Sequence, residues 1–190
     1  MPIRISIAGI SIIILLGITY SRNAIWLNEG TLWFDVIEKS VGNGKARGYY
    51  NLGRYEESFK PEYAIISYTR AIQMNPKHAN AFMNRGNVLD KMGFFEKAIQ
   101  DYDRAIEIQP QHHIAYYNRG VAYLNKAQIT NAIADFTKTI ELNPAYSDAY
   151  IKRGNAYFAN GDQKLAKIDY QKACELRNES GCEVVQRGGE

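Results

Sequence analysis

Few side chains in this chain have types and spacings that could do chemistry. The two cysteines, Cys174 and Cys182, could pair as a disulfide or remain as two buried thiols. A zinc site is not expected, because two thiols with no histidine close in sequence supply too few ligands. The adjacent His112 and His113 also have no metal-ligand company. We find no nucleophile with a base at motif spacing and no glycine-rich phosphate loop, so we expect no enzyme, no cofactor, no metal and no small-molecule substrate.

Charged side chains recur at one fixed separation in the second half of the chain. An arginine and a later aspartate occur together three times, and where Leu52 replaces the arginine, Ser67 replaces the aspartate. The three pairs are Arg85 with Asp101, Arg119 with Asp135, and Arg153 with Asp169. We predict a structural ion pair in each case, because the planar guanidinium binds a carboxylate bidentately. The alternative is a basic stripe that binds phosphates; the net charge of +3, with interspersed signs, argues against nucleic acid as the main partner.

The elements that position these residues follow from an internal repeat. A unit of 34 residues repeats at 79–112, at 113–146 and from 147 onward, and a copy one residue shorter begins at 46. Within each unit the apolar and small residues are spaced by three and four, which is typical of two helices. Gly93 lies between the halves and Pro110 follows the second half, where helices end. A fixed period of this length predicts stacked helical hairpins.

These repeats resemble the tetratricopeptide repeat family over roughly residues 46–178. The resemblance implies antiparallel helix hairpins in a right-handed superhelix, whose first helices line a concave groove that binds peptide segments of partner proteins. We therefore expect an all-α solenoid of about four hairpins that acts as a protein-binding scaffold, with a C-terminal tail at 179–190. The expected hairpins are residues 46–78, 79–112, 113–146 and 147–178.

The same resemblance implies which side chains face the groove. The sixth repeat position would hold a ladder of amides, similar to the ladder in O-GlcNAc transferase, that binds a peptide backbone without reading its sequence. Residues at this position are Asn51, Asn84, Asn118 and Lys152, and the neighbouring groove candidates are Tyr50, Met83, Asn87, Tyr117, Ile151 and Asn155. The alternative is solvated amides without a ligand. The carboxylate clamp of chaperone-binding members would need more lysines and arginines here, so it is not expected.

The N-terminal residues differ in kind from the repeats. Residues 5–20 contain no charge and seven isoleucines, which predicts a retained membrane helix within 1–20 or, as alternatives, a cleaved signal peptide or neither. The distribution of charges around this segment places the repeats on the extracytoplasmic side. Residues 21–45 would form a juxtamembrane segment with a capping helix, and Gly42, Asn43 and Gly44 would form a linker.

The junction carries a second resemblance. Residues 19–40 and the start of the first repeat are similar to the stretch after the last membrane helix of polytopic tetratricopeptide proteins such as the membrane O-mannosyltransferases. Matching residues are Arg22, Asn23, Trp26, Leu32, Trp33, Ala46 and Arg47. This implies an alternative function as the non-catalytic tail of a membrane glycosyltransferase. A third alternative is a periplasmic assembly factor with a cleaved signal.

A last resemblance concerns the two cysteines. Their spacing is similar to that of the bridge in cysteine-rich secreted helical-hairpin repeats, which implies a disulfide between Cys174 and Cys182. An even number of cysteines beyond a membrane or signal segment fits an oxidising compartment. The bridge would fold residues 179–185 back as a partial capping turn over Tyr157 and Tyr170.

Overall fold

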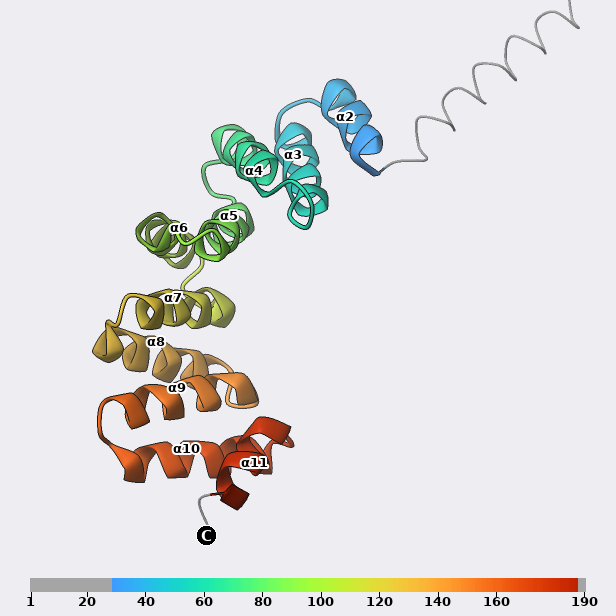
Figure 1. Cartoon of the computed structure of the whole chain (residues 1–190). Helices are drawn as coiled ribbons and strands as arrows, with labels where there is room; N and C mark the ends of the chain where they lie inside the picture. Colours follow the sequence, from blue (N-terminus) through green and yellow to red (C-terminus); the bar gives the residue numbers. More distant parts are fainter. Residues whose placement is uncertain (1–28, 188–190) are drawn as a thin grey trace, which may run out of the picture. The chain divides into compact units, whose positions relative to one another are not determined.

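The computed structural model describes residues 29–187, which form helices joined by short turns, and it contains no strand within that range (Figure 1). The chain divides after Asn75 into two compact units. The helices are α2 (Glu29–Lys39), α3 (Asn43–Glu56), α4 (Pro61–Met74), α5 (Ala79–Lys91), α6 (Phe95–Ile108), α7 (His113–Asn125), α8 (Ile129–Leu142), α9 (Ser147–Ala159), α10 (Gln163–Glu175) and α11 (Glu179–Arg187). The first unit holds α2 to α4, and the second holds α5 to α11.

In the first unit, α3 and α4 form the first hairpin and α2 packs on α3. Pro61 begins α4, where a missing backbone N–H costs nothing. The prediction of a linker at residues 42–44 is wrong in part, because α3 already begins at Asn43. Gly42 does turn the chain, with a φ of 57°, whereas Gly44 lies within α3 against Ser40, where an added Cβ would come within 3.0 Å of the serine Cβ.

In the second unit, three hairpins follow one another as α5/α6, α7/α8 and α9/α10, and Figure 1 shows α7 to α10 as successive layers. Each first helix has a glycine that receives an aromatic ring from the second helix. A Cβ at any of these glycines would lie 2.8 Å from that ring, so only glycine permits the contact. The pairs are Gly86 with Tyr102, Gly120 with Phe136, and Gly154 with Tyr170.

Alanines at one position of the second helices complete the core. Ala98 and Ala132 are fully buried and Ala166 is 1% exposed. Such small residues let helices approach closely, while rings such as Tyr102 and Phe136 fill the remaining space. The turns within the second and fourth hairpins use Gly93 and Gly161 at φ values of 81° and 90°. The prediction of helical hairpins from the repeat is therefore confirmed.

The C-terminal tail differs from its predicted structure. The tail predicted as a partial capping turn is the helix α11, which packs on α10. Among residues 29–187 we find no helix long and apolar enough to cross a membrane. The predicted membrane helix at 5–20 lies outside the described residues, as do Arg22, Asn23 and Trp26 of the junction.

Candidate functional site

The repeated arginines and aspartates lie together inside their hairpins. In each, the arginine Nε and Nη2 donate to the two carboxylate oxygens of the aspartate, at 2.7 to 2.8 Å. These aspartate side chains are only 7%, 7% and 4% exposed. The structure thus joins Arg85 with Asp101, Arg119 with Asp135, and Arg153 with Asp169. In the first hairpin, which lacks the arginine, Ser67 Oγ donates instead to the buried Glu56 carboxylate at 2.6 Å.

Arg119 also joins two hairpins, a role that the sequence reasoning missed. Its Nη1 donates to Asp103 Oδ1 on α6 at 2.6 Å. Its guanidinium lies 5.5 Å from the Tyr116 ring centroid and 5.9 Å from that of Tyr123. Burial lowers the pKa of Arg119, but hydrogen bonds to Asp135 and Asp103 outweigh burial and hold that pKa above its ordinary value. These arginines are therefore occupied in the structure and do not form a phosphate-binding stripe.

A pocket of about 340 Å³ lies on the side of the second unit formed by the first helices. Its lining includes four of the ten predicted groove residues: Asn87, Tyr117, Asn118 and Lys152. The other lining residues are Asp90, Lys91, Tyr102 and Val121. The pocket is therefore built from α5, α6, α7 and α9, and it combines amides, rings and charges.

Two amides at this pocket hold each other in a fixed orientation. Asn87 Oδ1 accepts a hydrogen bond from Tyr102 Oη at 3.0 Å and another from Asn118 Nδ2 at 2.7 Å. Within the described residues, Asn87 Nδ2 then has no acceptor and Asn118 Oδ1 has no donor. The pair thus leaves the Asn87 NH2 group as a donor and the Asn118 carbonyl oxygen as an acceptor, which together complement a peptide group.

The charges at the pocket favour a negatively charged ligand group. Lys91 and Lys152 line it together with one acid, Asp90. Burial raises the pKa of Asp90, and the hydrogen bond from Asn125 opposes that rise. Burial, followed by the nearby Tyr146 and Asp148, raises the pKa of Tyr117 to about 12, so this phenol is neutral near pH 7. The lining thus has more positive than negative side chains.

The remaining groove candidates lie elsewhere. Asn51 lines a separate pocket of about 280 Å³ in the first unit with Trp33, Arg54 and Tyr55. The Tyr50 ring lies 5.9 Å from that of Tyr68. Asn155 Oδ1 accepts from Tyr170 Oη at 2.8 Å. The last three groove candidates, Met83, Asn84 and Ile151, lie on α5 and α9 but do not line the 340 Å³ pocket.

The structure shows one diagonal contact between neighbouring first helices, and the expected ladder along one repeat position stays a prediction. Asn118 bonds to Asn87, three residues beyond the position predicted for the ladder on α5. The later hairpins do carry a sequence signal for the bond from Tyr102 to Asn87, but none for the bond between Asn118 and Asn87. Asn87 and Asn155 occur in hairpins whose second helix carries Tyr102 or Tyr170, whereas Val121 occurs in the hairpin with Phe136.

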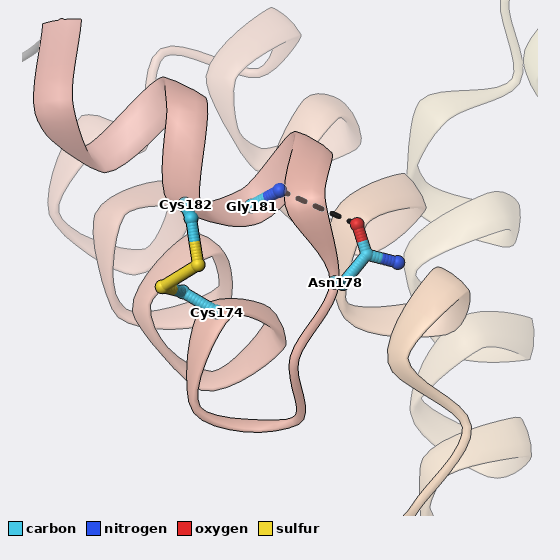
Figure 2. Close-up of a disulfide and its surroundings, with 4 residues drawn as sticks. All are labelled: Cys174, Asn178, Gly181 and Cys182. Carbon is cyan, nitrogen blue, oxygen red and sulfur yellow. Dashed lines mark hydrogen bonds between the residues drawn. A yellow bond between two sulfur atoms is a disulfide. The ribbon is translucent and has the colours of Figure 1, made fainter.

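The two cysteines are joined by a disulfide that ties α11 to α10, with their Cα atoms 4.5 Å apart (Figure 2). Asn178 Oδ1 accepts from the Gly181 backbone N–H at 3.3 Å, and its Nδ2 donates to Asp148 Oδ1 at 2.9 Å. An apolar pocket of about 210 Å³ remains beside α11. Its lining residues are Phe158, Gln163, Ala166, Lys167, Tyr170, Val184 and Val185, so Phe158 takes the place expected for Tyr157.

The histidines serve the turns between hairpins. His112 Nε2 lies 3.1 Å from Asn80 Oδ1, and His113 Nε2 lies 3.3 Å from Asn143 Nδ2. His78 Nδ1 accepts from the Ala81 backbone N–H at 3.3 Å. Among the described residues, no group of three or more histidines, cysteines or acids is placed to hold a metal ion.

Comparisons with known proteins identify the repeats. Models of the tetratricopeptide repeat match residues 79–112, 113–146 and 147–180, which together make up more than half of the chain. The crystal structure of MamA is similar with a TM-score of 0.71 and 25% identity, over 78% of this chain and 86% of that one. No curated protein sequence matches the chain. The resemblance of the junction to O-mannosyltransferases stays a prediction.

Two further solved structures share the fold. The first tetratricopeptide repeat domain of Spaghetti (RPAP3), bound to the HSP90 peptide SRMEEVD, has a TM-score of 0.55 and 29% identity, over 57% of this chain and 88% of that one. The Arabidopsis OM64 domain has a TM-score of 0.61 and 23% identity, over 63% of this chain and 99% of that one.

Proposed function

The chain belongs to the tetratricopeptide repeat family, whose domains bind protein or peptide partners, and we propose that it holds an extended segment of a partner protein in the pocket lined by Asn87 and Asn118. This makes it a non-catalytic scaffold. The supporting observation is the amide pair, because it leaves one donor and one acceptor on two residues that line the pocket. Main-chain peptide groups present the matching acceptor and donor whatever their side chains are.

The charged side chains of the pocket indicate which chemical group the proposed ligand carries. Lys91 and Lys152 would attract an acidic side chain or a C-terminal carboxylate next to the bound peptide group. The peptide in the Spaghetti (RPAP3) structure, SRMEEVD, is acidic, which supports this preference by analogy. We therefore propose a segment with at least one acidic group. We do not propose a full carboxylate clamp, because only two basic side chains line the pocket.

A peptide library displayed on phage and selected against the full chain would supply ligands for the test. Replacing Asn118→Ala should weaken the selected peptides by roughly 5–30-fold, because about 1–2 kcal/mol of hydrogen bonding is lost. The double replacement Asn87→Val with Tyr102→Phe copies the residues of the third hairpin and should weaken binding similarly without disturbing the packing. Isothermal titration calorimetry would measure the affinities.

The fourth hairpin offers a matched control. Asn155→Val with Tyr170→Phe removes the same type of side-chain hydrogen bond at the same repeat positions, but Asn155 is not among the residues that line the pocket. This variant should bind the selected peptides as the unchanged chain does. Equal affinities for the Asn118→Ala variant and the unchanged chain, with unaltered circular dichroism, would remove the amide pair from the proposed site.

We also propose that residues 5–20 attach the chain to a membrane, with the repeats on the extracytoplasmic side. The uncharged stretch is long enough for a short span, and a disulfide between Cys174 and Cys182 persists in oxidising compartments. Alkylation of the native chain under denaturing conditions without reductant should modify neither cysteine. Two modified cysteines would contradict the extracytoplasmic placement, and mass spectrometry of the same sample would reveal cleavage of residues 1–20.

A further inference from the structure

The side of α4 that faces solvent carries large apolar side chains. Tyr63 and Ile66 are 58% and 52% exposed, and Phe59 in the preceding turn is 51% exposed. Tyr63, Ile66 and Arg70 lie on one side of the helix, because their spacings of three and four match the helix period. We call Phe59, Lys60, Tyr63, Ile66 and Arg70 the α4 outer face.

The same repeat positions show that the fold does not require these apolar residues. Position by position, the middle hairpins have exposed polar or small residues where α4 has Tyr63 and Ile66. These are Lys97 and Gln100 in α6, and Asn131 and Ala134 in α8. An exposed apolar row at positions that tolerate lysine and glutamine indicates contact with something outside the hairpin.

The charges of the α4 outer face also differ from those of the later hairpins. The basic residues at the position of Arg70 each pair with a glutamate three residues on, in the pairs Arg104 with Glu107, Lys138 with Glu141, and Lys172 with Glu175. In α4 that glutamate is replaced by Gln73, and the Arg70 guanidinium lies 5.6 Å from the Tyr49 ring centroid. Lys60 Nζ lies 5.4 Å from the centroid of Tyr63. Exposed cations beside aromatic rings therefore occur together here, with Glu62 as the one acid of α4.

Exposed apolar residues are also concentrated in the first unit. Six of the twelve large hydrophobic side chains that are exposed lie within residues 31–75, although the second unit contains more than twice as many described residues. The last hairpin has Leu165 and Ile168 at the positions of Tyr63 and Ile66, but Gly161 replaces Phe59 and Lys172 is paired with Glu175. The second hairpin also has a lysine beside an exposed ring, with Lys97 Nζ 5.4 Å from the Phe94 centroid, but Gln100 replaces the aliphatic side chain. At these repeat positions of the described hairpins, rings, aliphatic side chains and cations without an acidic partner thus occur together in the first hairpin alone.

We propose that the α4 outer face lies on the surface of a lipid bilayer that contains anionic lipids. Aromatic and aliphatic side chains enter the interface between head groups and acyl chains, while Lys60 and Arg70 meet the lipid phosphates. The inference rests on the proposed membrane attachment through residues 5–20, which precede α2 in sequence. The bilayer surface would then hold the first hairpin.

To test this proposal, a fluorescent label would be attached at one position of the α4 outer face in the full chain. Ile66→Cys, modified under non-reducing conditions with a fluorophore that responds to polarity, would be reconstituted into vesicles of phosphatidylcholine and phosphatidylglycerol. Cys174 and Cys182 do not react, because they are bonded to each other. We expect a blue shift of the emission and quenching by brominated lipids. Replacing Lys60→Glu and Arg70→Glu should abolish most of both signals, and vesicles of phosphatidylcholine alone should reduce them.

The matched control is Ile168→Cys at the same position of the last hairpin, which should show neither signal. Equal emission and quenching for the two labels in vesicles would contradict the proposal. So would a blue shift of the Ile66→Cys label that appears without lipid and grows with protein concentration, because that result indicates contact between copies of the chain. A chain that does not float with the vesicles would contradict both this proposal and the membrane attachment, whereas floating with a water-exposed label at 66 would contradict this proposal alone.

Discussion

The first and third hairpins bury a carboxylate between their helices in two different ways. In the first, Glu56 is 8% exposed and accepts a hydrogen bond from Ser67. In the third, Asp135 is also buried and binds the guanidinium of Arg119 bidentately. Both hairpins therefore satisfy a buried carboxylate, the first through a hydroxyl group and the third through an ion pair. What the arginine adds is a bond to Asp103 in the neighbouring hairpin.

The largest effect is expected from Asp135→Asn in the third hairpin. Arg119 would lose a charged partner between packed helices, so the free energy of unfolding should fall by about 1–3 kcal/mol. Urea denaturation followed by circular dichroism would measure it. Asp103→Asn should cost less than about 1 kcal/mol, because that carboxylate is 43% exposed. An unchanged unfolding midpoint for Asp135→Asn would mean that the buried pair is dispensable.

A double replacement, Arg119→Leu with Asp135→Ser, copies the residues of the first hairpin. It should regain part of the lost stability, because neither charge is then left without its partner. The recovery stays incomplete because Tyr123 occupies the position of Glu56, so the new serine lacks the carboxylate that Ser67 binds.

The first hairpin gives the second prediction. Ser67→Ala would leave the buried Glu56 carboxylate without the hydroxyl that donates to it, and the expected loss is about 1–2 kcal/mol. Ser67→Thr keeps the hydroxyl and serves as the control. A loss as large for the threonine variant as for the alanine variant would assign the effect to packing rather than to the hydrogen bond.

A substitution in the turn of the third hairpin should change the free energy of unfolding by a smaller amount. Ala127 has a φ of 57°, where its neighbours at the same repeat position, Gly93 and Gly161, have no Cβ to strain. Ala127→Gly should stabilise the chain by roughly 0.5–1 kcal/mol, because relief of backbone strain exceeds the extra entropy of glycine in the unfolded chain. Thermal unfolding would detect the rise. A lower melting temperature would show that the αL strain at this turn is negligible.

The smallest expected effect is on the pH dependence of the free energy of unfolding. Burial lowers the pKa of His78 and of His112 below the ordinary value of 6.5, so the folded chain binds these protons less readily than the unfolded chain. Stability is therefore full above 6.5 and falls as the pH drops toward the folded pKa values. His112→Tyr, which copies Tyr146 of the next turn, should flatten this dependence in denaturation curves between pH 7.5 and 5.5, about one unit above and below that value. An unaltered pH slope would exclude His112 as a contributor.

The sequence predicted much of this architecture because each contact repeats. The pairing of Arg119 with Asp135 followed from the joint replacement of both residue types in the first hairpin, and the hairpins followed from the recurring glycines and prolines. The bond from Arg119 to Asp103 could not be predicted in this way, because the matching residues, Thr137 and Gln171, are of different types. The contact itself recurs, because Arg153 Nη1 donates to Thr137 Oγ1 at 3.1 Å, but the change of residue type at the accepting position leaves no periodic signal.

Contacts in the groove and in the C-terminal tail also could not be predicted from the repeat. A single repeat position could not reveal the diagonal bond between Asn118 and Asn87, because the offset between successive first helices is not written in any one repeat. Helix α11 lacks the aromatic residues of the repeat, and the sequence predicted only that the bridge folds these residues back as a partial capping turn. Its packing depends on Gly181, where a Cβ would lie 2.8 Å from that of Ala173. That contact depends on the path of the chain after α10.

The bridge between α10 and α11 also determines what a protease can do to this end of the molecule. The loop that it closes contains Arg177, an exposed residue with a φ of 62°. Exposed loops of this kind are where trypsin-like enzymes cut. A cut after Arg177 would leave both fragments joined through Cys174 and Cys182, so the nicked chain would gain only the mass of one water molecule and would separate into two pieces only after reduction.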